Sequence, residues 1–158
     1  MQRIYTGGTF DLIHPGHISL LKHCFDLSLQ GHRTEEGEVV VALNTDDFVE
    51  AYKGRRPVMS YKERMEVLLA IRWVDRVVPN LSGADSKPTI VRVKPDVVAI
   101  GEDWKNKDYY AQMQFTPEWL SERCISLVYV PLLYTHKGAA GYELHSSTRL
   151  RTRAQVAV

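Results

Sequence analysis

Short apolar segments alternate with helical patterns along most of this chain, and that alternation constrains the fold more than any other feature. Five segments are predicted to be strands, at Arg3–Thr6, Val39–Leu43, Arg76–Val78, Val97–Ile100 and Leu127–Val130. Strands separated by helices pair in parallel, because each helix carries the chain back to the starting edge of the sheet. With 158 residues, 44% of them hydrophobic, the chain is predicted to form one α/β domain over residues 1–158 with a five-stranded parallel sheet.

Three helices are predicted between these strands. After His17, apolar residues recur at helical spacing, at Ile18, Leu21, Phe25 and Leu29. A second helix begins after Ser60, which is placed to form a capping box with Glu63. Its inward-facing residues are predicted to be Met65, Leu68 and Leu69. A third helix begins near Pro88 and ends before Pro95.

The segment from Tyr5 to His17, with the sequence YTGGTFDLIHPGH, carries the clearest chemical signal. The paired glycines allow backbone N–H groups to approach a ligand closely, and the helix start that follows favours negative charge. His14 and His17 can both donate hydrogen bonds to the oxygens of a phosphate group in transfer. The segment therefore predicts a phosphate site between a strand and a helix.

Two other interpretations of the histidines are disfavoured. A zinc pair is disfavoured because the intervening Pro15 and Gly16 prevent the histidines from sharing one helical face, and no Cys or His cluster supplies further ligands. A glycine-rich turn with incidental histidines is the second. It is disfavoured because ten consecutive positions, Gly8 to His17, match one known signature.

That signature is the HxGH motif of the nucleotidyltransferase superfamily, and GTFDLIHPGH resembles its cytidylyltransferase form. The resemblance implies a Rossmann-like three-layer fold with strand order 3-2-1-4-5. It implies that an acceptor phosphate attacks the α-phosphorus of a nucleoside triphosphate, releasing pyrophosphate, with His14 and His17 as catalytic residues. The nucleotide-binding residues implied in this segment are Gly8, Thr9, Phe10, Asp11 and Gly16.

A basic loop follows the second predicted strand and contains Lys53, Arg55 and Arg56. A run of basic residues is usually found on a solvent-exposed surface. This loop, however, lies near the carboxyl edge of the sheet, where open α/β sheets bind ligands. In glycerol-3-phosphate cytidylyltransferases, which the chain resembles most, a similar loop supplies phosphate contacts. The three residues are therefore predicted to bind the acceptor, with Lys53 also in a catalytic role.

Two further segments resemble nucleotide-binding elements of the same group. Arg72, in the run IRWVDRVV, matches an arginine associated with the active site. The run Gly101, Glu102, Asp103 and Trp104 is similar to the segment that lines the base pocket. A carboxylate can accept from the exocyclic amine of cytosine, and an indole offers a flat wall for a base.

Near the end of the chain, Ser146, Ser147, Thr148 and Arg149 resemble the element that holds the leaving pyrophosphate. The family usually carries an arginine shortly before this element. Here the arginine is absent and several residues are extra, which leaves the identity of the acceptor open. The glycine-rich run Lys137–Gly141 is predicted to be a loop, either a lid or a passive connection.

Composition restricts the partners. Twenty basic and nineteen acidic residues give a net charge of +1, which provides no global field for nucleic acid or for a membrane. No apolar run approaches the length of a membrane span, and the first residues lead into a strand rather than a signal peptide, so a soluble cytoplasmic protein is expected. Cys24 and Cys124 have no framework spacing and are predicted to be buried free thiols.

The sequence thus predicts an enzyme that transfers CMP from CTP to a small phosphorylated alcohol, with glycerol 3-phosphate as first choice. Mg²⁺ is expected through the triphosphate, because no protein-only cage of ligands is visible and the metal-ligating residues are unknown. Two alternatives stay open: an adenylyltransferase of the heptose-phosphate or flavin type, and a nucleotide-binding regulator without turnover. The resemblance also implies a homodimer.

Overall fold

A five-stranded parallel sheet forms the centre of the protein. The computed structural model describes residues 1–30, 37–131, 134–138, 141–144 and 147–156, with the backbone alone at 134–138, 141–144, 147–149, 153 and 156. The strands are β1 (Arg3–Gly8), β2 (Glu38–Asn44), β3 (Arg76–Asn80), β4 (Val97–Gly101) and β5 (Ser126–Val130). They pair in the order β3-β2-β1-β4-β5, all in parallel, which confirms the predicted Rossmann-like topology.

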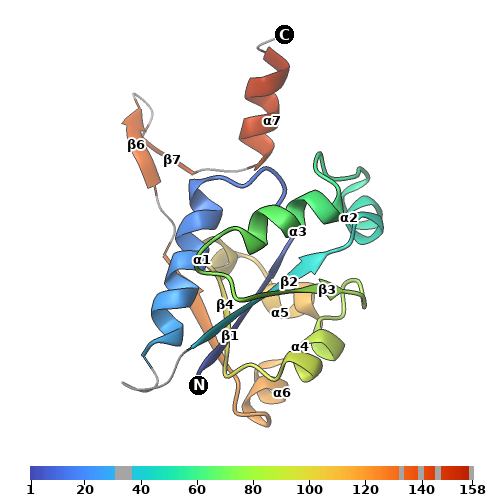
Figure 1. Ribbon diagram of the computed structural model, residues 1–158, viewed down its shortest axis with the longest axis vertical. Coiled ribbons are helices and arrows are strands. Elements are labelled where there is room, and N and C mark those ends of the chain that lie inside the picture. Colours follow the sequence, from blue (N-terminus) through green and yellow to red (C-terminus); the bar gives the residue numbers. More distant parts are fainter. Residues whose placement is uncertain (31–36, 132–133, 139–140, 145–146, 157–158) are drawn as a thin grey trace.

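Helices cover both faces of this sheet (Figure 1). On one face, α1 (Pro15–Ser28) and α3 (Tyr61–Leu69) pack their buried residues Leu21 and Leu68 against β2. On the other face lie α4 (Lys87–Val93), α5 (Tyr109–Met113) and α6 (Pro117–Ser121), packed on alternate residues of β1, β2 and β4. Because both faces are covered, the central strands are apolar throughout, and Val39–Leu43 are at most 1% exposed.

Capping side chains determine where two of the helices begin. The Ser60 capping box is confirmed: the Ser60 side chain accepts from the Glu63 N–H, and the Glu63 carboxylate accepts from the Ser60 N–H at 2.7 Å. The first helix, in contrast, begins at Pro15 rather than after His17. The reason is that His14 caps it, since its Nδ1 accepts from the Gly16 N–H at 3.1 Å, and proline fits the first helical position.

Two burial predictions were wrong. Leu69, predicted to face inward, is 51% exposed at the last position of α3. Cys24 is buried as predicted, but Cys124 is exposed, in a left-handed turn (φ 55°) that leads into β5.

Several elements were not predicted. The charged run after β2 forms α2 (Asp46–Lys53), and a 3₁₀ helix, η1 (Glu102–Asn106), follows β4. The glycine-rich run predicted as a loop contributes to an antiparallel hairpin, β6 (Tyr134–Gly138) with β7 (Gly141–Leu144). This hairpin and α7 (Ser147–Val156) extend from one end of the molecule (Figure 1).

Candidate functional site

A cavity of about 530 Å³ opens at the carboxyl ends of β1, β2, β3 and β4. Most of the predicted site residues line it together, namely Gly8, Thr9, Phe10, Asp11, His14, Gly16, His17, Lys53, Arg55, Gly101, Asp103 and Trp104. These residues come from three separate parts of the chain. The parallel topology brings them together because every strand ends at the same edge of the sheet.

The loop between β1 and α1 is conformationally strained. Phe10 and Leu12 adopt left-handed backbone conformations, with φ of 49° and 52°. A residue with a Cβ is held in this region only when its surroundings fix it, and such strain concentrates at functional sites. Phe10 is 3% exposed and its ring lies 5.1 Å from the ring of His17, so the buried Phe10 side chain packs against His17.

The two histidines form a stacked pair, with ring centroids 3.8 Å apart and ring planes inclined by 28°. Because Nδ1 of His14 accepts the Gly16 N–H, a neutral His14 carries its proton on Nε2. Burial, and next the charge of His14, lowers the pKa of His17 to about 3. At neutral pH, His17 is therefore an uncharged hydrogen-bond donor.

Asp11 bonds the β1–α1 loop to two segments that are distant in the sequence, the one before α3 and α7. Its carboxylate is 2% exposed and accepts the backbone N–H groups of Val58 at 2.9 Å and of Met59 at 3.0 Å. It also forms an ion pair with Arg151 of α7. Burial alone would raise the pKa of Asp11, but the two N–H donors and Arg151 outweigh it, so the pKa is lowered.

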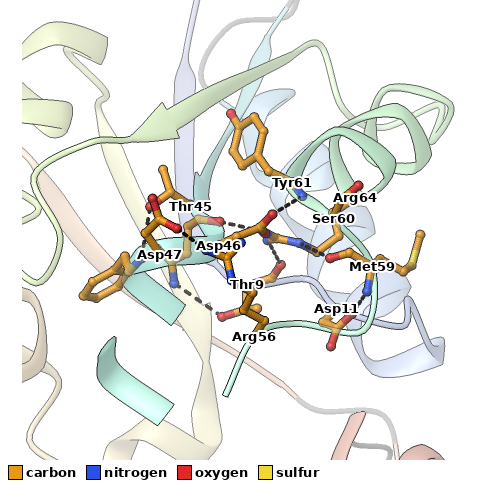
Figure 2. Close-up of polar contacts among 12 residues, drawn as sticks. Thr9, Asp11, Thr45, Asp46, Asp47, Arg56, Met59, Ser60, Tyr61 and Arg64 are labelled. Atoms are coloured by element: carbon orange, nitrogen blue, oxygen red, sulfur yellow. Dashed lines mark hydrogen bonds and ion pairs between the residues drawn. The ribbon is translucent and has the colours of Figure 1, made fainter. Parts of the chain in front are cut away.

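Arg64 was not predicted as a site residue, yet it is fully buried beneath the loop. Its guanidinium donates to the carbonyl oxygens of Thr9 at 2.6 Å and Asn44 at 2.9 Å. It also pairs with Asp46 at 2.6 Å and donates to Met59 O at 3.1 Å (Figure 2). A single side chain thus joins the β1–α1 loop, the end of β2, the start of α2 and the segment before α3.

The predicted acceptor-binding arginines separate in the structure. Lys53 and Arg55 line the cavity together with Arg151, which was not predicted as a site residue. Burial, and then the charges of Arg151 and Arg55, lower the pKa of Lys53. Arg56 does not line the cavity, because its guanidinium bonds the exposed carboxylates of Asp47 at 2.5 Å and Glu50 at 2.9 Å on α2.

The segment after β4 forms one wall of the cavity. The Trp104 ring lies edge-on to Tyr109 at 5.4 Å, and the Lys107 ammonium is 4.9 Å from its centre. Asp103 lines the cavity and pairs with Lys107 at 3.1 Å. Glu102 does not line it and pairs with Lys105 at 3.8 Å.

Other predicted residues do not reach the described cavity. Arg72 follows the end of α3 and lies 6.0 Å from the centre of the Trp73 ring, away from the cavity lining. Ser146 falls outside the described residues. For Ser147, Thr148 and Arg149 the backbone alone is described, as the first turn of α7.

Within the described part of the chain, no three His, Cys, Asp or Glu side chains converge as a metal site. The carboxylate of Asp11 is already engaged by two N–H groups and an arginine. A divalent ion at this site would therefore depend on phosphate oxygens for most of its ligands. None of the described helices is long and apolar enough to cross a membrane.

Comparison with known proteins agrees with this geometry. The chain matches the family model described as Cytidylyltransferase-like over residues 5–153. It is 34% identical to glycerol-3-phosphate cytidylyltransferase of Bacillus subtilis over 131 residues, covering 83% of this chain and 87% of that protein. It is 36% identical to FAD synthase of Thermococcus sibiricus over 135 residues, covering 85% and 82%.

A second FAD synthase, from Pyrococcus horikoshii, is 42% identical over 101 residues, and this alignment covers 64% of the chain and 63% of that relative's length. Among solved structures, the lipopolysaccharide core biosynthesis protein of Thermoplasma volcanium aligns with a TM-score of 0.62 and 28% identity, covering 84% of this chain and 97% of that one. The chain therefore belongs to the Cytidylyltransferase-like family of the nucleotidyltransferase superfamily.

Proposed function

We propose that this protein transfers CMP from CTP to a small phosphorylated alcohol, with glycerol 3-phosphate as the first candidate, and releases pyrophosphate. One observation carries the proposal. A single cavity of about 530 Å³ joins the His14–His17 pair, the basic group Lys53, Arg55 and Arg151, and a wall that contains Trp104. These are the groups needed to hold a triphosphate, an anionic acceptor and a base side by side.

The reaction needs no side-chain nucleophile. An oxygen of the acceptor phosphate forms a bond to the α-phosphorus, while the bond from that phosphorus to the bridging oxygen breaks and pyrophosphate leaves. His14 and His17 donate hydrogen bonds to the α-phosphate and bridging oxygens, where negative charge develops. Both are held in place before the reaction, His14 by its cap and His17 by stacking, so they stabilise that charge without reorganising.

The leaving pyrophosphate is assigned to Ser146, Ser147, Thr148 and Arg149 from their resemblance to the family element. The ion pair between Asp11 and Arg151 supports this assignment, because it ties α7 to the loop that carries the histidines. We expect Mg²⁺ to bind through the triphosphate, where it would neutralise phosphate charge. Chelation by EDTA should then abolish turnover, and added Mg²⁺ should restore it.

The choice of base rests on Asp103 and Trp104, because Glu102 does not line the cavity. The Asp103 carboxylate or a nearby backbone carbonyl can accept from the cytosine amine. UTP presents a carbonyl at that position and would leave the acceptor unpaired. Sites built to bond a group can reject analogues that lack it by roughly 10⁴-fold.

The FAD synthase relatives favour a second candidate, transfer of AMP from ATP to a flavin mononucleotide acceptor. The glycerol-3-phosphate cytidylyltransferase of Bacillus subtilis supports the first candidate, because the alignment covers 83% of this chain and 87% of that protein.

Turnover measurements decide between them. CTP, UTP and ATP should each be tested with glycerol 3-phosphate and with flavin mononucleotide, with products separated by chromatography. Higher kcat/KM for CTP with glycerol 3-phosphate supports the proposal, whereas equal values for CTP and UTP contradict the base assignment. Preference for ATP with the flavin establishes the adenylyltransferase, and nucleotide binding without turnover on any pair establishes the regulator.

The homodimer expected from the resemblance is part of the same proposal. The chain has a mass of 18.1 kDa. Sedimentation at micromolar concentration should give about twice that value, and a single species at the monomer mass would rule the dimer out.

A further inference from the structure

Hydrogen bonds between side chains link the ends of three neighbouring strands at the cavity. Asn80, the last residue of β3, donates to Oδ1 of Asn44, the last residue of β2, at 2.9 Å. The amide nitrogen of Asn44 donates in turn to the hydroxyl of Thr9, the residue after β1, at 3.4 Å. All three residues line the cavity, and the reaction proposed above gives no role to either asparagine.

A backbone carbonyl fixes the direction of these hydrogen bonds. The amide nitrogen of Asn80 also donates to the carbonyl oxygen of Gly83 at 3.0 Å, and Oδ1 of Asn80 accepts from the Thr89 hydroxyl at 3.5 Å. A carbonyl oxygen can only accept, so a flipped Asn80 amide would place two oxygens against each other. Asn80 therefore presents its nitrogen to Asn44, and Asn44 presents its oxygen to Asn80 and its nitrogen to Thr9.

This direction decides what the Thr9 hydroxyl can do. Its oxygen accepts from Asn44, so its hydrogen is left to donate, and no described residue accepts that hydrogen. The buried Arg64 guanidinium holds the backbone of both residues, through Thr9 O at 2.6 Å and Asn44 O at 2.9 Å (Figure 2). Thr9 is half-buried and is held at both its backbone and its side chain, so its hydroxyl is a preorganised donor at the cavity wall.

The order of the strands places this donor on one side of the cavity. Strands β2 and β3 lie on one side of β1, whereas β4, which leads to Trp104, lies on the other. The Thr9 side chain is on the β2 side because it bonds Asn44. Lys53 ends α2, the helix that follows β2, and Arg55 comes shortly after it. The Thr9 hydroxyl thus lies on the side of the basic residues, away from the wall assigned to the base.

We propose that Asn80 and Asn44 are positioning residues that orient the Thr9 hydroxyl so that it donates a hydrogen bond to the acceptor phosphate. This inference rests on the proposed function and adds two residues that act through a third. The oxygens of an ionised phosphate accept hydrogen bonds, so a hydroxyl fixed as a donor binds them and a hydroxyl fixed as an acceptor would repel them. The bond holds the acceptor in place before its oxygen attacks the α-phosphorus.

Thr9→Val removes the hydroxyl and keeps the branched shape of the side chain. It should raise the KM for glycerol 3-phosphate by about ten- to a hundredfold, the usual effect of one lost hydrogen bond to a charged group. The KM for CTP should stay unchanged, because the hydroxyl lies on the acceptor side. Thr9→Ser keeps a hydroxyl and should recover most of the affinity for the acceptor.

Asn44→Leu tests the positioning role through a double-mutant cycle. Alone, it should raise the KM for glycerol 3-phosphate, because the Thr9 hydroxyl loses its fixed direction. Combined with Thr9→Val it should have no further effect, because the hydroxyl that it orients is already gone. A merely structural role predicts the opposite, namely that the two substitutions raise the KM independently. Asn80→Leu should repeat this pattern from one residue further along the chain of hydrogen bonds.

Thr116→Ala is the control for lost stability. Thr116 caps α6 by accepting the Trp119 N–H at 3.1 Å, and it does not line the cavity. This variant should melt at a lower temperature with both KM values unchanged. Asn44→Leu carries the test, because Asn44 is only half-buried, whereas Asn80→Leu also deprives the Gly83 carbonyl of its donor. An unchanged acceptor KM in Thr9→Val, a raised KM for CTP, or independent effects in the cycle would each overturn the inference.

The same cycle with flavin mononucleotide separates this inference from the proposed function, because that acceptor also attacks through a phosphate. If the protein transfers AMP to the flavin and not CMP to glycerol 3-phosphate, but the cycle shows the coupling in the KM for the flavin, only the proposed function fails. If CMP transfer proceeds and Thr9→Val leaves the acceptor KM unchanged, only this inference fails. If no pair turns over, calorimetric titration with glycerol 3-phosphate measures the same cycle as Kd values.

Discussion

Replacing His17 with glutamine should remove a defined part of the pH dependence of stability. In the folded protein, burial and the charge of His14 lower the pKa of His17 from 6.5 to about 3. The unfolded chain binds a proton at the ordinary value, so between these two values it holds more protons than the folded state. Acidification below the ordinary pKa therefore favours unfolding, and the loss continues until the folded-state pKa is reached.

The size of the effect follows from the same two values. Between the two pKa values, each pH unit lowers the free energy of unfolding by about 1.4 kcal/mol. A pH of about 5 lies one and a half units below 6.5, so the free energy of unfolding falls by about 2 kcal/mol. At about pH 7.5, His17 is uncharged in both the folded and the unfolded state, so none of this unfolding free energy is lost. The wild-type protein should thus lose about 2 kcal/mol more than His17→Gln between these conditions.

Urea unfolding followed by tryptophan fluorescence at the two pH values measures this difference. The NMR signals of the His17 ring provide an independent check, because they should not titrate between about pH 7.5 and 5 while the protein stays folded. Equal losses of unfolding free energy in the two proteins, or a ring that titrates near its ordinary pKa, would refute the reasoning.

Variants at four further positions test other parts of the structure. His14→Ala should lower kcat by roughly 10²–10³-fold and also lose about 1 kcal/mol of stability, because His14 caps α1. His14→Asn should restore the cap but not the turnover, and substantial kcat in either variant would contradict the donor role. Lys53→Ala should raise the KM for the acceptor, whereas Arg56→Ala, whose guanidinium bonds acidic residues on α2, should leave it unchanged; equal effects would argue against the cavity assignment. Ser60→Ala should cost about 1 kcal/mol in urea unfolding without changing kcat, through loss of the capping box; an unchanged stability would refute the cap.

Features that depend on neighbours along the chain could be predicted from the sequence. The strands were visible because a sheet covered on both faces requires continuous apolar runs, as at Val39–Leu43. The Ser60 capping box spans three residues and is formed by the side chains that the sequence names. The grouping of residues around the end of β1 could also be expected, since glycines, histidines and a strand end are adjacent within Tyr5–His17, and the structure shows a cavity there.

Contacts between distant segments could not be predicted in this way. Arg64 appears in the sequence as one more charge on a helix, and Asp11 as a candidate ligand of the nucleotide. Only the folded chain brings Arg64 to Thr9, 55 residues away, and Asp11 to Arg151, 140 residues away. The fold likewise turns Arg56 toward Asp47 and Glu50, because α2 was not anticipated and its exposed side offers acidic partners.

Tyr5 shows what local sequence predicts and what depends on tertiary packing. In the sequence it is an aromatic residue in a strand, and its burial could be predicted from that alone. The burial of its hydroxyl without a hydrogen-bond partner among the described residues is set by tertiary packing, since Tyr5 shares a cluster with Tyr109 of α5. Local sequence determines which elements form, because their hydrogen bonds and caps are short-range. The tertiary structure decides which side chains share a cavity, because that depends on how the elements pack across the sheet.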